Sequence, residues 1–140
     1  MNLHLKNKIR EQLIQYEGLR LKPYLDSVGK LTWGIGWNIE DTELREIEAV
    51  FRADNDIEYF HDWLQRSFRW FSVLDETRQI VLINMAFNLG TQRFITFKKL
   101  IAALNSQDYE VAALEMLDSK WAAQVKGRAT ELAEMMLKGG

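Results

Sequence analysis

Apolar residues recur at helical spacing at the start of the chain. Four of them stand three or four positions apart, which predicts an amphipathic helix: Leu5, Ile9, Leu13 and Tyr16. Glu17-Gly18 follows, and glycine is the usual residue just past the end of a helix. We therefore assign residues 1–16 to a first helix.

The pattern changes to alternation with period two in the next segment. Residues 26–30 are rich in turn formers and residues 31–37 alternate, which together predict a β-hairpin with further extended chain. We expect a small β lobe over residues 17–41. One face of the extended segment makes a poor core and suits close approach of another backbone or a ligand, because it carries a hydroxyl and two glycines: Thr32, Gly34 and Gly36.

Helical patterns dominate the rest of the chain. Asp41-Thr42 offers an N-cap, so we expect a connecting helix over residues 42–66. A larger helical lobe over residues 67–140 follows. Its centre is Glu76–Leu89, which is apolar nearly all round, with shorter helices near residues 97–104, 108–119 (from Ser106 or Gln107) and 128–138. With no internal repeat or linker, the pattern predicts a single domain over residues 1–140, of α+β class and mostly α.

Composition narrows the chemistry. The 140 residues include no Cys, which excludes disulfides and thiolate catalysis. They include only two His, so a metal site or a Ser/His triad has almost no histidine available. The net charge of −2 argues against a nucleic-acid partner. No apolar run approaches the length of about 18 residues that a membrane span needs. The N-terminus lacks the features of a signal peptide. We expect a protein without cofactor, metal or membrane partner, made in the cytoplasm.

Two carboxyls and a hydroxyl stand where the first helix gives way to the hairpin. Glu17 lies at the C-terminal end of the helix, where the helix dipole disfavours a negative charge. Its carboxyl is therefore expected to keep its proton more readily than Asp26 on a polar turn. The hairpin returns Thr32 toward Asp26. Carboxyls with different proton affinities are what glycoside hydrolysis requires, although a chance pair on a solvated surface is the alternative interpretation.

The segment Glu17–Asp26, followed by Gly29–Gly36, resembles the active-site segment of the phage-type (T4-like) lysozymes. The family's spacing of Glu, eight residues, Asp, five residues and Thr is kept without a gap. Leu74–Gly90 is similar to the buried central helix of that family, and Ser119–Trp121 with Arg128 is similar to a later helical segment. The resemblance covers nearly the whole chain.

This resemblance implies a lysozyme-like fold, in which a small N-terminal β-hairpin lobe and a larger C-terminal helical lobe enclose a cleft. It implies hydrolysis, with inversion, of the β-1,4 bond between N-acetylmuramic acid and N-acetylglucosamine in bacterial peptidoglycan. Glu17 is then the general acid, and Asp26 and Thr32 activate water. Arg128 is expected to pair with Glu17, and three further residues are expected around the site: Gly36, Asn88 and Trp121. We expect a bacteriolytic, endolysin-like monomer that acts on the cell wall after release.

Some positions depart from the family pattern. Trp37 stands where the family usually has a His, and Asp54 stands where that His has its carboxylate partner, so the usual pair cannot form. Only five residues separate Gly36 from Thr42, which predicts a reduced third strand.

Other interpretations stay open at this stage. Trp33 and Trp37 either fill the β lobe or stack on sugar rings, whereas Trp63, Trp70 and Phe71 are expected to pack in the core. Asn84, on an apolar helix, is expected to be a buried amide with its hydrogen bonds satisfied. A lytic transglycosylase with one acid/base Glu, or an inactive relative that only binds glycan, is the alternative function. Four settings stay open: a phage endolysin, a tail-associated protein, a prophage remnant or an engineered sequence of this family.

Overall fold

The computed structural model describes all residues 1–140, which divide into two compact units. The first unit is Met1–Ala49 and the second is Val50–Gly140. A three-stranded sheet lies in the first unit and the remaining regular structure is helical, so the α+β, mostly α class is confirmed. The expected single domain over residues 1–140 stays a prediction.

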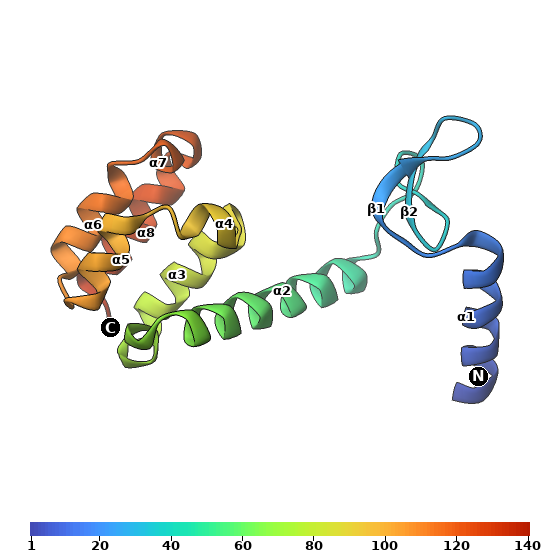
Figure 1. Ribbon diagram of the computed structural model, residues 1–140, viewed down its shortest axis with the longest axis horizontal. Helices are drawn as coiled ribbons and strands as arrows, with labels where there is room; N and C mark the ends of the chain where they lie inside the picture. The colour runs from blue at the N-terminus through green and yellow to red at the C-terminus, as the bar shows by residue number, and fades with distance from the viewer. The chain divides into compact units, whose positions relative to one another are not determined.

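The first helix, α1, spans Leu3–Glu17 (Figure 1). The Asn2 side chain caps its start by accepting a hydrogen bond of 2.8 Å from the Leu5 N–H. Gly18 ends it with φ +79°, a conformation that glycine adopts without strain, and its N–H donates to the Ile14 carbonyl. The predicted helix is confirmed, and Glu17 is its last residue.

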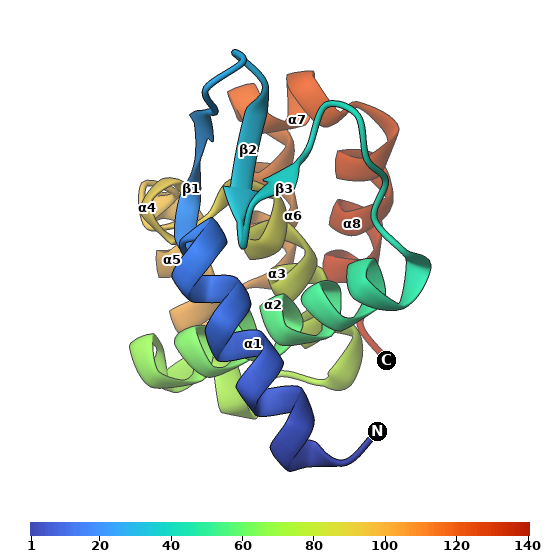
Figure 2. The same cartoon turned by 90° about the vertical axis from the view of Figure 1, so that its right-hand side faces the viewer.

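Three antiparallel strands follow in the order β1-β2-β3 (Figure 2). They are β1 (Arg20–Leu25), β2 (Leu31–Gly34) and β3 (Trp37–Asn38). Tyr24 on β1 and Asn38 on β3 both lie opposite Thr32, which places Thr32 in the middle of the sheet. The two-residue β3 confirms the predicted reduction of the third strand.

Gly34 and Gly36 flank a tight turn between β2 and β3 rather than sharing a strand face with Thr32. Both have φ +66°, which reverses the chain within a few residues. The expectation of one face bearing Thr32, Gly34 and Gly36 is therefore wrong beyond the end of β2. Period-two alternation alone did not distinguish a continuing strand from two short strands with glycines at the turn.

The connecting helix, α2, spans Glu46–Ser67, so its predicted start at residue 42 is wrong. Thr42 closes the turn after β3 instead of capping a helix, because its N–H and its hydroxyl both donate to the Asn38 carbonyl. The N-terminal turn of α2 is held by Glu48, whose carboxylate accepts a 3.0 Å hydrogen bond from the Arg45 N–H.

The second unit consists of the larger part of α2 and a series of shorter helices. The predicted α3 (Glu76–Leu89) is confirmed, with Asp75 as its N-cap and Gly90 as its C-cap. The start predicted for the helix at residues 108–119 is wrong, because Asp108 rather than Ser106 or Gln107 provides its cap. Three short elements, at residues 69–73, 91–94 and 120–125, were not predicted separately. The elements around α3 are the 3-10 helix η1 (Arg69–Val73), α4 (Thr91–Phe94), α5 (Lys98–Asn105), α6 (Tyr109–Leu117), α7 (Lys120–Val125) and α8 (Gly127–Lys138).

Each element of the second unit contributes to one apolar core. On α3 the buried side chains lie on one side, whereas Ile80 and Phe87 are 48% and 46% exposed, so a helix that is apolar nearly all round is buried on one side only. Trp63 packs edge-on against Phe94 with ring centroids 5.6 Å apart, and Trp70 and Phe71 are buried, as expected. No helix of the chain is both long and apolar enough to cross a membrane. The core residues include Leu64, Phe71, Leu82, Met85, Phe94, Leu100, Met116, Trp121 and Met136.

Arg78 and Asp75 join the start of α3 to the end of α8. The Arg78 guanidinium donates to the Met136 carbonyl at 2.7 Å and to the Leu137 carbonyl at 3.0 Å. It therefore satisfies carbonyls that the last turn of a helix leaves unpaired. The same guanidinium lies 3.7 Å from the centroid of the Tyr109 ring. Asp75 forms a 3.0 Å ion pair with Arg78.

The charge of Asp75 depends on these contacts. Partial burial by itself would raise the pKa of the Asp75 carboxyl. Hydrogen bonds from the Arg78 N–H, the Arg78 side chain and the Gly140 N–H outweigh burial, and together with the Arg78 charge they hold the pKa below its usual value. A carboxyl whose pKa is lowered by folding stabilises the folded state only while it is ionised.

Asp75→Asn is expected to lower the free energy of unfolding at neutral pH by about 1 kcal/mol, because a neutral acceptor replaces a charged one. The contribution is fully present above the unfolded-state pKa of about 3.9 and is lost as the pH falls through the lower folded-state pKa. Urea unfolding of both proteins at neutral pH and near pH 2 measures the difference. Glu76→Gln, at the exposed neighbouring position, is the control. A gap between wild type and Asp75→Asn that does not narrow in acid would contradict the role of the Asp75 charge.

Candidate active site

Glu17 and Gly36 are brought together within the first unit. Glu17 is the exposed last residue of α1, and Gly36 lies in the turn between β2 and β3. A Cβ atom on Gly36 would overlap Oε2 of Glu17, so the carboxyl lies directly against the Gly36 backbone. Two features therefore require glycine here: the positive φ of the turn and the close approach of the carboxyl.

Asp26 lies in the turn between β1 and β2, where backbone N–H groups orient its carboxylate. Oδ1 accepts hydrogen bonds from the N–H groups of Val28 at 2.9 Å and of Lys30 at 2.8 Å. Oδ2 has no hydrogen-bond partner within the chain. An Asp that bonds to the backbone two residues on is typical of a tight turn. One oxygen thus fixes the side chain, while the other is free to accept a hydrogen bond from water or a ligand.

Thr32 is held by the residue that also holds Asp26. Its hydroxyl donates a 2.9 Å hydrogen bond to the Lys30 carbonyl, and the Lys30 N–H donates to Asp26. The hairpin therefore links Thr32 to Asp26 through the Lys30 backbone. Thr32 is 3% exposed, so it is more enclosed than the open face expected from the sequence. Its hydroxyl oxygen retains lone pairs that can accept a hydrogen bond, whereas its proton is committed to Lys30.

Trp121 and Asn88 are joined in the second unit by a 2.7 Å hydrogen bond from the indole Nε1 to the Asn88 Oδ1. Trp121 on α7 is 2% exposed and belongs to the core, whereas Asn88 on α3 is exposed. The indole is therefore a buried support that orients the amide of Asn88. With Oδ1 engaged, the amide NH₂ of Asn88 remains available as a donor.

Arg128 at the start of α8 is held by Asn84 on α3. Its Nε and one terminal nitrogen donate to Asn84 Oδ1 at 2.9 Å and 2.6 Å. Asn84 is half-buried and its side-chain oxygen is satisfied, which agrees with the expectation except that the residue is not fully buried. The hydrogen bonds between Asn84 and Arg128 were not predicted from the sequence. A single amide on an otherwise apolar helix was the available sign that Asn84 has a polar partner. The expected pairing of Arg128 with Glu17 stays a prediction.

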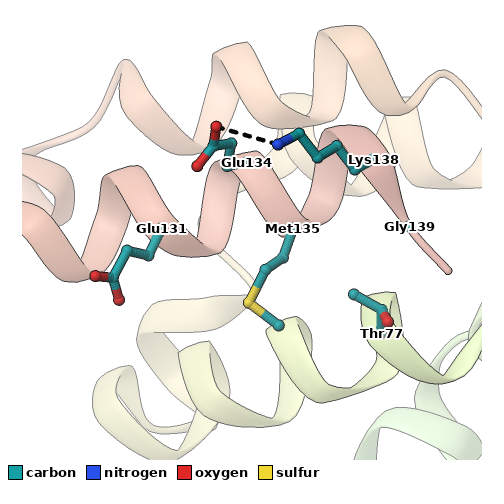
Figure 3. A pocket seen from close by; sticks show the side chains of 6 residues that line it. All are labelled: Thr77, Glu131, Glu134, Met135, Lys138 and Gly139. Atoms are coloured by element: carbon teal, nitrogen blue, oxygen red, sulfur yellow. Dashed lines mark hydrogen bonds and ion pairs between the residues drawn. The ribbon is translucent and has the colours of Figure 1, made fainter.

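Two surface depressions in the second unit lie apart from these residues. One, of about 380 Å³, lies between α3 and α8, with Met135 pointing toward α3 and a Glu134–Lys138 ion pair at its edge (Figure 3). The other, of about 350 Å³, is lined by residues of the segments 96–100 and 115–119. Neither is lined by Glu17, Asp26 or Thr32. No group of three or more His, Asp or Glu side chains is arranged to hold a metal ion.

Comparison with protein families decides the identity of the fold and its activity. The model of the phage lysozyme family matches residues 14–135, a span that contains Glu17, Asp26, Thr32 and Arg128. The chain belongs to the phage lysozyme family. It is therefore a lysozyme, a glycoside hydrolase that lyses peptidoglycan, and the resemblance found in the sequence is confirmed.

Known relatives of this lysozyme come from several sources. It is 31% identical to an endolysin of Acyrthosiphon pisum secondary endosymbiont phage 1, over 93% of this chain and 88% of the relative. It is 24% identical to a probable T4-type lysozyme of Dictyostelium discoideum, over 95% of each. It is 29% identical to the pre-baseplate central spike protein Gp5 of Enterobacteria phage T4, over 92% of this chain. The lysozyme spans 27% of the length of that spike protein.

Gly36→Ala is expected to lower kcat on peptidoglycan by about 10²-fold, because the new methyl group displaces the Glu17 carboxyl. Gly90→Ala is the matched control, since Gly90 has φ +80° and nothing lies within 4 Å of an added Cβ. Each substitution should cost about 1–2 kcal/mol of stability from the positive φ alone. Turnover of purified peptidoglycan and thermal unfolding separate the two effects. An equal loss of activity in both variants would mean that strain, rather than the Glu17 contact, is responsible.

Proposed function

We propose that this lysozyme is an N-acetylmuramidase that cleaves the β-1,4 bond between N-acetylmuramic acid and N-acetylglucosamine with inversion. The observation that carries the proposal is the difference between its two carboxyls. Glu17 ends a helix against the bare backbone of Gly36, whereas Asp26 is oriented through Oδ1 by two backbone N–H groups and has Oδ2 free. Different environments give two carboxyl groups different roles in glycoside hydrolysis.

In the proposed reaction Glu17 donates its proton to the glycosidic oxygen as the bond to the anomeric carbon breaks. Asp26 accepts a proton from a water molecule through the free Oδ2, and the water oxygen bonds to the opposite side of the anomeric carbon. Thr32 accepts a hydrogen bond from the same water. This route requires a carboxyl separation of roughly 6.5–9.5 Å, so that water fits between Asp26 and the sugar.

Two residues of the second unit are also proposed to take part in the function. Arg128, oriented by Asn84, is proposed to pair with Glu17. Asn88, oriented by the buried Trp121, is proposed to donate its amide N–H to the sugar strand. In each case a neighbouring residue fixes the side chain, which supports the assignment. Precise catalytic geometry requires side chains that are held in this way.

The proposed substrate is the glycan strand of bacterial peptidoglycan, and the protein is proposed to act on it as a monomer of one domain, without a cofactor or metal. We propose that it meets the cell wall after release from the cytoplasm, as an endolysin does. An endolysin that is 31% identical is among the relatives of this chain, which supports this setting.

Glu17→Gln and Asp26→Asn are each expected to lower kcat on purified peptidoglycan by about 10²–10⁴-fold, because each removes one proton-transfer step. Glu11→Gln is the matched control, since Glu11 is an exposed carboxylate on the same helix α1. Turbidity clearing by all four proteins gives the comparison. Clearing by Glu17→Gln at the wild-type rate would remove Glu17 from the acid role.

The products are expected to carry a free reducing end in the α configuration when first released, because inversion at a β bond gives the α anomer. Proton NMR of the anomeric signal during the first turnovers tests this, before mutarotation mixes the anomers. Mass spectrometry of the same products tests the transglycosylase alternative. An anhydro-sugar, lighter by one water and without a reducing end, would show that Asp26 and Thr32 do not deliver water.

A further inference from the structure

Tyr24 on β1 lies directly opposite Thr32 on β2. Residues that face each other across an antiparallel pair of strands point to the same side of the sheet, with Cβ atoms roughly 4.5–5.5 Å apart. The next pair along, Leu25 and Leu31, points to the other side. The Tyr24 side chain therefore lies beside Thr32, on the face that carries the hydroxyl proposed to hold the reacting water.

Thr32 is enclosed although it belongs to a small sheet. It is 3% exposed, and the residues directly opposite it are Tyr24 on β1 and Asn38 on β3. The Asn38 amide is committed to its own turn, because Oδ1 accepts hydrogen bonds from the N–H groups of Glu40 and Asp41. Its Nδ2 donates to the Asp41 carboxylate at 2.9 Å. Tyr24 is thus the opposite neighbour that has a large apolar surface with which to cover Thr32.

Arg20 holds the Tyr24 ring in place. The guanidinium carbon Cζ of Arg20 lies 4.2 Å from the centroid of the ring, which is a cation–π contact within the same strand. Arg20 forms no ion pair within the chain, so no carboxylate competes with the ring for its charge. The Tyr24 side chain is half-buried. With the guanidinium over it, the ring is kept on the Thr32 side of the sheet.

Cover over Thr32 matters because of the way its hydroxyl is bonded. The hydroxyl donates its proton to the Lys30 carbonyl, so only its lone pairs can bind the reacting water. On an open surface, water molecules in changing positions would compete for those lone pairs. In an enclosed place one water is held in one orientation, and the orientation of the reacting groups contributes strongly to the rate. A residue that encloses Thr32 therefore affects the chemical step.

We propose that Tyr24 is a positioning residue of the reaction. Its ring, held by Arg20, shields Thr32 from bulk water and so reserves the Thr32 hydroxyl for the water that bonds to the sugar. The inference rests on the proposed function, because Tyr24 acts through the role proposed there for Thr32. Tyr24 itself touches no reacting atom and binds no sugar. Its loss therefore lowers kcat and leaves KM nearly unchanged.

Steady-state turnover of soluble peptidoglycan fragments separates kcat from KM. Tyr24→Ala is expected to lower kcat by about tenfold with KM changed less than about twofold. Tyr24→Phe keeps the ring and is expected to stay within about twofold of wild type in both constants. Arg20→Ala is expected to lower kcat by about threefold, because the ring is then held less firmly. The matched controls on β1 are Leu25→Ala, whose 67% exposed side chain points to the other face, and Lys22→Ala, an exposed cation.

A double-mutant cycle measures whether Tyr24 acts through Thr32. Thr32→Val removes the hydroxyl, and in that background Tyr24→Ala is expected to lower kcat by no more than about twofold further. All assays are run at a temperature at which circular dichroism shows every variant to be folded, so that lost stability does not enter kcat. Equal factors in the two backgrounds overturn the inference, as does a loss in Tyr24→Phe or Leu25→Ala that equals the loss in Tyr24→Ala.

The Thr32→Val variant also separates this proposal from the proposed function. A lowered kcat in Thr32→Val beside a wild-type kcat in Tyr24→Ala overturns the positioning role of Tyr24 alone. A wild-type kcat in Thr32→Val contradicts the water-activating role of Thr32 as well, and the role of Tyr24 fails with it.

Discussion

The tight turn between β2 and β3 is the constraint on which the candidate site depends. Its glycines, Gly34 and Gly36, both have φ +66°, a backbone conformation that residues other than glycine adopt only with strain. Their missing side chains also make room for two others: the Trp37 ring lies on Gly34, and the Glu17 carboxyl lies on Gly36. One turn thus positions both the proposed acid and the exposed Trp37 ring. Because the two contacts are on neighbouring backbone, a change in the turn alters both together.

The turn between β1 and β2 orients Asp26 and Thr32, the residues that are proposed to activate water. There the backbone of Lys30 connects the two side chains, because its N–H donates to Asp26 and its carbonyl accepts a hydrogen bond from the Thr32 hydroxyl. Backbone groups of a turn are fixed by the chain itself, so Asp26 keeps its orientation without help from a distant side chain. The free Oδ2 then needs only a water molecule and a substrate to complete the proposed acid–base pair.

The second unit supplies support of another kind, in which a buried or half-buried residue orients an exposed one. Trp121 does this for Asn88, and Asn84 does it for Arg128. Both pairs join α3 to a later helix, and the Arg78 contacts join α3 to the end of α8 as well. The central helix is therefore the element against which Asn88 and Arg128, the residues of this unit proposed to take part in the function, are aligned. Its exposed Ile80 and Phe87 show that a helix can be central without being buried on every side.

Much of the architecture, and the choice of the proposed catalytic residues, followed from the sequence by itself. Local signals determined α1 and α3, since Asn2, Gly18, Asp75 and Gly90 each act within one turn of the helix they cap. The spacing from Glu17 to Thr32 identified the family, because that segment is continuous in the chain. Tertiary structure decided what local patterns do not contain. In the folded chain Thr42 lies in a turn rather than at a helix start. The Glu17 carboxyl contacts Gly36, and Arg128 donates hydrogen bonds to Asn84, 44 positions away. These outcomes depend on which distant groups meet, and alternation or capping patterns report only on neighbours along the chain.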